Sequence, residues 1–127
     1  MNIEQLSFID EIDEKKVRRA VIKQLKRFKA LRVAVQNKDE QIAEGVENPF
    51  PKIVDKEKEK RFKVKQMERA IEYALDDIER EVIEKKYLSS SRVKDINLYL
   101  DLGITKDQYY EHKRQAIFAL AEALNII

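Results

Sequence analysis

Residues 102–124, LGITKDQYYEHKRQAIFALAEAL, begin with a glycine-containing turn, continue as a charged segment and end as an almost wholly apolar one. Thr105 and Gln108 fit a Thr-x-x-Gln capping box, which is a specific signal for the start of a helix. If Tyr109 marks the inward face, four later residues fall near it at about 100° per residue: His112, Lys113, Ala116 and Leu120. Phe118 lies opposite Tyr109, so the run AIFALA is apolar all round. We expect this second half of the helix to be buried against the first helix of the chain or against a second protomer.

Upstream of this stretch, apolar periodicity predicts four more helices, at about residues 14–37, 55–75, 78–87 and 92–101. The first has an apolar stripe at spacings of three and four, formed by Val17, Val21, Leu25, Phe28, Leu31 and Val35. Residues 38–55 break the pattern with Gly45, Pro49 and Pro51, and we expect Phe50 to pin this loop to the core. Asp76-Asp77 and Ser89-Ser90-Ser91 are expected to cap the helices that follow them.

The expected fold is therefore all-α. It consists of an N-terminal basic helix with a Pro-containing loop (residues 1–54) and a helical domain (residues 55–127) that ends in a helix-turn-helix.

Composition excludes several classes of protein. A chain of 127 residues holds one domain, or one small domain with an extension, and the absence of cysteine excludes disulfides and thiolate metal sites. No apolar run approaches about 18 residues, so we expect no membrane span, and the acidic N-terminus is not a secretory signal. His112 is the only histidine, and packing explains it better than catalysis or metal binding. We expect neither an enzyme nor a cofactor.

The net charge of +2 conceals a strong asymmetry. Residues 15–38 contain ten Lys or Arg and no acid, residues 1–14 contain five acids and no base, and residues 76–127 contain eight bases and ten acids. A basic block of this kind favours contact with a polyanion, most often nucleic acid, although a solvated helix face is the alternative. The side chains expected to contact a DNA backbone are Arg18, Arg19, Lys23, Lys26 and Arg27.

Two helices of unequal length joined by a turn at Gly103 are typical of a helix-turn-helix, whose second helix enters the major groove. The polar residues on the outward face of that helix are the candidates for DNA contact: Lys106, Gln108, Tyr110, Glu111 and Arg114. Ser91 and Arg92 would bind phosphate at the start of the preceding helix, or would only cap it. A solvated face remains the alternative for the outward residues, and packing remains one for Tyr110.

The segments LDDIEREVIEKKYL (75–88) and VKDINLYLDLGITKDQYYEHKRQAIFALAEAL (93–124) resemble region 4 of bacterial sigma factors. More closely, Tyr109-Tyr110 followed by Lys113, Ala116 and Leu120-Ala121 resembles the ArpU family of phage-encoded transcriptional regulators. The similarity covers about residues 75–125. It implies a cytoplasmic protein of a bacterial host cell that binds double-stranded DNA, with RNA polymerase as a further expected partner, and that regulates late phage or prophage genes.

Two features depart from the helix-turn-helix pattern. Tyr99 occupies a position, four before the turn glycine, where many such motifs have a small residue. Either the two helices are further apart or the register is shifted by one. Residues 76–127 are net acidic, so the basic helix at 15–38, or the Lys-rich start of the helix at 55–75, is expected to supply the phosphate contacts. The near-neutral charge of the motif leaves open an alternative function, that of a non-enzymatic adaptor that binds RNA polymerase or a phage packaging component. Small terminase subunits, which act in phage packaging, also use helix-turn-helix folds. A homo-oligomer is possible in either case.

Overall fold

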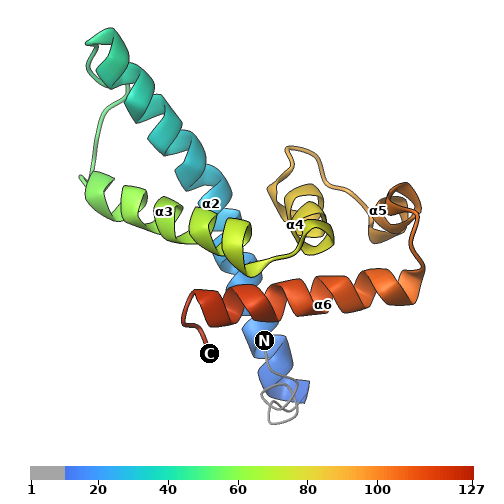
Figure 1. Ribbon diagram of the computed structural model, residues 1–127. Coiled ribbons are helices and arrows are strands. Elements are labelled where there is room, and N and C mark those ends of the chain that lie inside the picture. The colour runs from blue at the N-terminus through green and yellow to red at the C-terminus, as the bar shows by residue number, and fades with distance from the viewer. Residues whose placement is uncertain (1–10) are drawn as a thin grey trace.

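The computed structural model describes residues 11–127, and this part of the chain is helical and contains no strand (Figure 1). The elements are α2 (Glu11–Glu44), α3 (Glu57–Ala74), α4 (Asp77–Ile83), the π-helical turn η1 (Glu84–Leu88), α5 (Asp95–Leu102) and α6 (Lys106–Ala123). The predicted all-α class is confirmed. The first ten residues of the predicted N-terminal segment lie outside the described residues.

Helix α2 is longer than the sequence predicted, because it continues through residues 38–44 instead of breaking there. Two ion pairs join this extension to α3, Lys38 to Glu57 at 3.9 Å and Asp39 to Arg61 at 2.8 Å. Residues 38–44 are therefore helical although they have no apolar stripe, because ion pairs to a neighbouring helix support them. The helix ends at Gly45, whose φ of 67° is a left-handed conformation that glycine adopts without strain.

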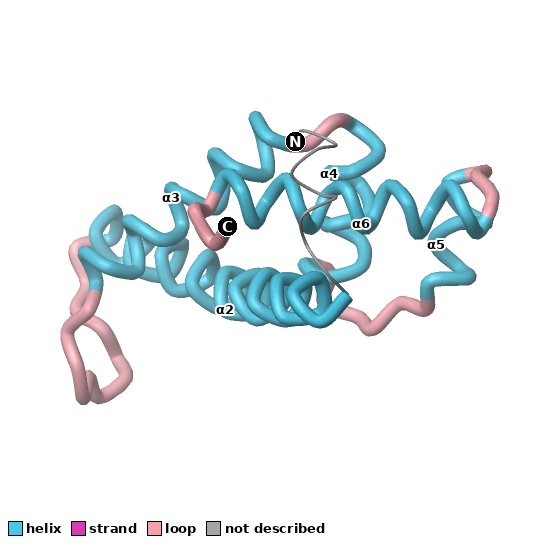
Figure 2. The backbone as a smooth tube through the Cα atoms, turned by 90° about the horizontal axis from the view of Figure 1, so that it is seen from below, coloured by secondary structure: helices cyan, strands magenta, loops and turns pink. Residues whose placement is uncertain are grey.

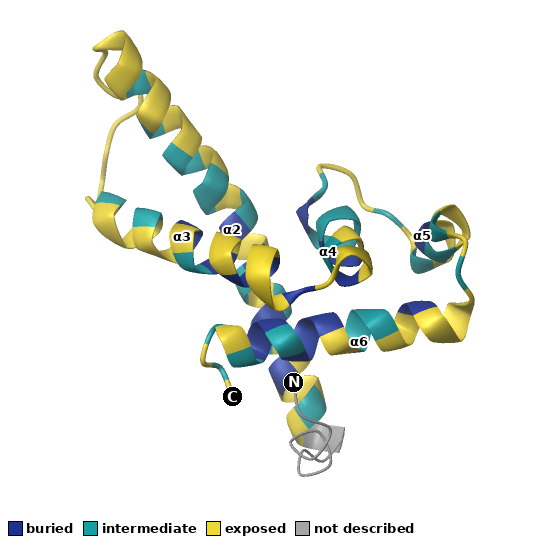
Figure 3. Ribbon diagram, viewed as in Figure 1, coloured by how far each residue is buried: buried dark blue, intermediate teal, exposed yellow. Residues whose placement is uncertain are grey.

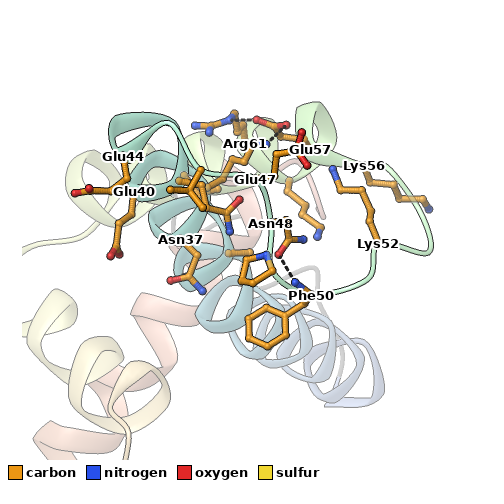
Figure 4. A pocket seen from close by; sticks show the side chains of 17 residues that line it. Asn37, Glu40, Glu44, Glu47, Asn48, Phe50, Lys52, Lys56, Glu57 and Arg61 are labelled. Carbon is orange, nitrogen blue, oxygen red and sulfur yellow. Dashed lines mark hydrogen bonds and ion pairs between the residues drawn. The ribbon is translucent and has the colours of Figure 1, made fainter.

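The loop after α2 contains no helix around Asn48 and Phe50, as the prolines predicted. The expected role of Phe50 was wrong, because its side chain is 73 % exposed. Its backbone N–H donates to the side-chain oxygen of Asn48 at 3.1 Å, which fixes a local turn (Figure 4). The loop is thus held by its own polar groups and does not reach the core.

The main core lies where α2, α3 and α6 cross (Figure 3). Helix α2 contributes Val17, Val21, Leu25 and Phe28, as its apolar stripe predicted. Helix α6 contributes Ala116, Ile117, Phe118, Leu120 and Ala121, each at most 2 % exposed. The second half of α6 is therefore buried as expected, and among the described residues the partner that covers it is the first helix of the same chain. Seen from below, α2 runs along the lower edge of the view, α6 lies above it, and α5 lies beside the right end of α6 (Figure 2).

The main core includes residues from both sides of the boundary expected near residue 54. Apolar residues of α2, before the boundary, pack in one cluster with residues of α3 and α6, after it. Beyond this core α2 and α3 diverge toward the loop at residues 45–56, where most side chains are exposed (Figures 1 and 3).

The junction between α3 and α4 is stabilised by a capping box. The Asp76 carboxylate accepts the backbone N–H of Glu79 at 2.8 Å, and the Glu79 carboxylate accepts the backbone N–H of Asp76 at 2.8 Å. The predicted cap at Asp76 is therefore confirmed. Arg80 donates to three carbonyl oxygens at the end of α3, those of Ile71, Glu72 and Leu75. Unpaired groups at both helix ends are thus satisfied by side chains.

No helix within residues 11–127 is long and apolar enough to cross a membrane.

We expect Phe118→Ala to lower the free energy of unfolding by about 3–5 kcal/mol, because it leaves a large cavity between α2 and α6. Urea denaturation followed by circular dichroism measures this. Tyr73→Ala is the matched control, because Tyr73 is 78 % exposed on α3, and its effect should stay within about 0.5 kcal/mol. Equal effects of the two variants would contradict the assigned core.

Candidate nucleic-acid interface

Helices α5 and α6 are joined by the three-residue turn 103–105. Gly103 adopts a φ of 67°, and the backbone N–H of Ile104 donates to the Tyr99 carbonyl at 3.1 Å, so the turn closes α5. The capping box predicted at Thr105 is confirmed. The Thr105 hydroxyl accepts the Gln108 N–H at 3.1 Å, and the Gln108 side chain accepts the Thr105 N–H at 3.0 Å. The start of α6 is therefore fixed by the turn residues themselves.

A small second apolar cluster connects α4, α5 and α6. It consists of Val82, Leu98 and Tyr109, each at most 2 % exposed. Tyr109 is buried as expected, and its ring centroid lies 5.9 Å from that of Tyr99. Two tyrosine rings thus lie in the interface between α5 and α6. A small residue at position 99 would allow these two helices to approach each other more closely.

Asp95, the first residue of α5, is the centre of a polar network. Its carboxylate accepts a hydrogen bond from the Tyr109 hydroxyl at 2.5 Å and contacts the ammonium groups of Lys113 at 3.3 Å and Lys86 at 3.4 Å. Lys86 also donates to the carbonyl oxygen of Val93 at 2.9 Å. One carboxylate therefore connects η1, the loop before α5, and α6. The only sign of Asp95 in the sequence is an acid in the first turn of a helix, which does not reveal its partners.

The protonation equilibria of this network reflect its burial. Burial by itself raises the pKa of Asp95, but the hydrogen bond from Tyr109 and the charges of Lys113 and Lys86 outweigh it and hold this pKa below its usual value. Burial raises the pKa of Tyr87 to about 12, and the negative charge of Asp95 adds to the effect. Burial also lowers the pKa of Lys113, against the opposing pull of Asp95. The carboxylate is thus stabilised in its charged form at neutral pH.

His112 packs toward α4, in agreement with the expected packing role. Its side chain is half-buried, its Nδ1 atom is buried without a hydrogen-bond partner among the described residues, and it interacts electrostatically with Glu79 of α4. Burial raises the pKa of Glu79, whose carboxylate is already used as a helix cap. Residues 11–127 contain no group of three or more acidic or histidine side chains that could hold a metal ion.

The first half of α6 exposes four of the five predicted contact residues: Lys106, Gln108, Tyr110 and Glu111. Their side chains are not equally available. Gln108 is engaged in the capping box, and Glu111 accepts a hydrogen bond from Gln115 at 3.0 Å. Tyr110 is 43 % exposed and lies edge-on against Tyr109. Lys106 is exposed and forms no ion pair with any side chain that the structure describes.

The fifth predicted residue, Arg114, lies where α6 crosses α2. Its guanidinium is paired with the carboxylate of Glu14 and stands 5.4 Å from the ring centroid of Phe118. The hydrogen bond to Glu14 raises the pKa of Arg114. Arg114 therefore helps to join two helices in addition to any contact with a ligand. The sequence did not reveal this, because 100 residues separate the two partners.

Ser91 and Arg92 are exposed, but they do not lie at the start of a helix as expected. Helix α5 begins at Asp95, and its N-cap is Lys94, which has no side-chain cap. The preceding residues stay extended because the Lys86 ammonium binds the Val93 carbonyl and the Ser89 hydroxyl donates to the Lys85 and Ser91 carbonyls. Lys94, exposed beside Arg92, thus takes the place that the sequence analysis gave to Ser91 and Arg92.

The five predicted basic residues of α2 are all exposed: Arg18, Arg19, Lys23, Lys26 and Arg27. None forms an ion pair with a side chain in the described part of the chain. Arg19, Lys23 and Lys26 follow one another at spacings of four and three, so they share one helix face. The charge of Arg18 acts on Tyr87 and Lys113, which places it beside the Asp95 network. Arg27 instead borders a groove between α2 and α3.

Two other cations of α2 have structural roles. Lys29 donates to the Ser89 carbonyl at 2.6 Å, and Arg32 lies 3.9 Å from Glu84. These contacts hold η1 and the loop after it against α2. The basic helix is therefore divided between side chains that bind its own protein and side chains that face solvent.

No family model, curated protein or solved structure matches this chain. The resemblance to the ArpU family and to sigma region 4 rests on the sequence motif alone.

We expect Asp95→Asn to lower the free energy of unfolding by about 1–3 kcal/mol, because it removes the charge that two lysines and a tyrosine share. Since the pKa of Asp95 is lowered in the folded state, its stabilisation is complete above pH 3.8 and is lost as the pH falls through the folded-state value. The difference between wild type and variant should therefore disappear in acid. Asp101→Asn, at an exposed position of the same helix, is the control; an equal loss there would contradict the assigned network.

Proposed function

We propose that this chain is a phage or prophage DNA-binding transcriptional regulator, with late genes as its targets, and that α5 and α6 form its helix-turn-helix. The observation that supports this most is the arrangement of α6. Its polar first half is exposed, its start is fixed by a capping box, and its second half is buried against α2, on which Arg19, Lys23 and Lys26 are exposed and form no ion pair with residues 11–127.

In this proposal the first turns of α6 enter the major groove. Lys106, Tyr110 and Glu111 face the base edges, and Glu111 accepts a hydrogen bond from cytosine N4. Gln108 offers its amide hydrogens while its oxygen stays in the cap. Arg114 contributes only if a phosphate competes with Glu14 for its guanidinium.

Cations supply the phosphate contacts. Arg18, Arg19, Lys23 and Lys26 come from α2, and Arg92 with Lys94 from the loop before α5. Their number compensates for the net acidity of residues 76–127, because backbone affinity depends on the number of phosphates neutralised. The role is binding, with no catalysis and no cofactor, and the site of action is the cytoplasm of the bacterial host.

The second candidate is a non-enzymatic adaptor that binds RNA polymerase or a phage packaging component. It is favoured by the internal use of three proposed reading residues, since Gln108, Glu111 and Arg114 all have partners within the chain. Such an adaptor would bind DNA weakly, without preference for sequence.

Selection of fragments from the genome that encodes the chain tests sequence recognition. We expect one sharply enriched site, and Lys106→Ala should weaken binding to it by about 1–3 kcal/mol in fluorescence anisotropy. Lys65→Ala, an exposed lysine on α3, should leave that affinity unchanged. Diffuse enrichment, or identical effects of both variants, would favour the adaptor. Lys106 suits this test better than Gln108, because replacing Gln108 also removes a helix cap.

Salt dependence tests the basic face of α2. Replacing Arg19, Lys23 and Lys26 with glutamine should reduce the slope of log affinity against log salt by about 2–3, because three counterion-releasing contacts are lost. The matched control replaces Lys58, Lys60 and Lys65, which are exposed on α3 and carry the same total charge. A wild-type affinity that barely changes with salt would contradict DNA binding through this face.

A further inference from the structure

An apolar groove of about 350 Å³ lies between α2 and α3, at the C-terminal end of α6 and not at its polar first half. Its floor contains Phe28 and Met67, which are buried, and its walls contain Leu31 and Phe62. Phe62 is 63 % exposed. A large aromatic side chain left open above an apolar floor is characteristic of a binding site.

The C-terminal residues close one end of this groove. Asn125 adopts a positive φ of 58°, and the backbone N–H of Ile126 donates to the Ala121 carbonyl at 2.8 Å. This turn directs Leu124 and Ile126 onto the core, where both line the groove. The groove is therefore built by three separate segments of the described chain.

The charges at the groove have one sign. Each wall contributes one cation, Arg27 from α2 and Lys63 from α3, and the lining includes no acid. The α2 wall also belongs to the acid-free tract of residues 15–38. A cationic rim around an apolar floor favours an apolar ligand with negative charge along its edges.

Other hollows of comparable size select no such partner. One, of about 570 Å³, lies at the start of α3, where both Glu59 and Lys58 line it. Another measures about 530 Å³ and lies at the diverging ends of α2 and α3. Acidic and basic side chains both surround it, including Glu44 and Glu47 as well as Lys52 and Arg61 (Figure 4).

We infer that the groove between α2 and α3 binds an acidic amphipathic helix of a protein partner. The apolar face of that helix would lie on Phe28, Phe62 and Met67, and its carboxylates would face Arg27 and Lys63. This is the helix-in-groove mode of recognition, in which anchors at spacings of three and four fill an apolar trough. Double-stranded DNA fits poorly, because its phosphates would meet apolar side chains. The inference does not depend on the proposed reading of DNA by α6.

The test uses the full chain and a fluorescein-labelled peptide of about 14 residues, with Leu and Phe on one helical face and Glu on the other. A matched peptide carries Lys at every Glu position. We expect the acidic peptide to bind and the basic one not to bind in fluorescence anisotropy. Phe62→Ala should weaken binding of the acidic peptide by about tenfold or more. Tyr73→Ala removes another exposed aromatic side chain from the same helix and should have no effect, since Tyr73 does not line the groove.

Charge reversal gives a second measurement that does not depend on apolar contact. The double variant Arg27→Glu/Lys63→Glu should lose the acidic peptide and gain the basic one. Wild type that binds both peptides equally, or a Phe62→Ala variant that keeps full affinity, would overturn the inference.

Displacement of the peptide by double-stranded DNA would assign the groove to the nucleic-acid surface. Self-association that Phe62→Ala abolishes, seen by sedimentation, would assign it to a second copy of the chain. Loss of specific DNA binding by Lys106→Ala with unchanged peptide binding would separate this site from the proposed function.

Discussion

The packing of α6 against α2 is the contact on which the rest of the structure depends. An 18-residue helix that is apolar on all sides over its second half is not stable in water unless another element covers it. The stripe of Val17, Val21, Leu25 and Phe28 on α2 provides that cover, and α3 completes it. Because this end of α6 is held on several sides, its polar first half extends from a rigid base. The position of α5 then depends on contacts with that first half.

Those contacts are largely polar, and this has a physical reason. Helix α5 is eight residues long and buries only Leu98 fully, so apolar burial alone orients it weakly. Asp95 compensates by joining Tyr109, Lys113 and Lys86 at one point. A network of this kind fixes direction as well as distance, because each hydrogen bond requires a particular geometry. The orientation of α5 relative to α6 thus depends mainly on charged and polar contacts, because α5 buries little apolar surface.

Different side chains of helix α2 have different roles. Its apolar stripe forms the core, Lys29 and Arg32 hold η1 and its loop, and Arg19, Lys23 and Lys26 face solvent without acidic partners among the described residues. Arg27 lies at the edge of the apolar groove with α3. A DNA surface and a protein-binding groove on different faces of one helix would allow a DNA-bound protein to hold a second protein without competition between the two ligands.

Local signals in the sequence determined the all-α class, the stripe of α2, the capping boxes at Asp76 and Thr105, and the burial around Phe118. Each depends on residues a few positions apart, where helix geometry alone fixes the outcome. The sequence could not show that Asp95 meets Lys86 and Lys113, that Arg114 pairs with Glu14, or that Phe50 and Phe62 remain exposed. It also misplaced the end of α2 and the start of α5. Those features depend on how helices cross, and a crossing is decided by the sum of apolar burial and ion pairing between segments up to 100 residues apart.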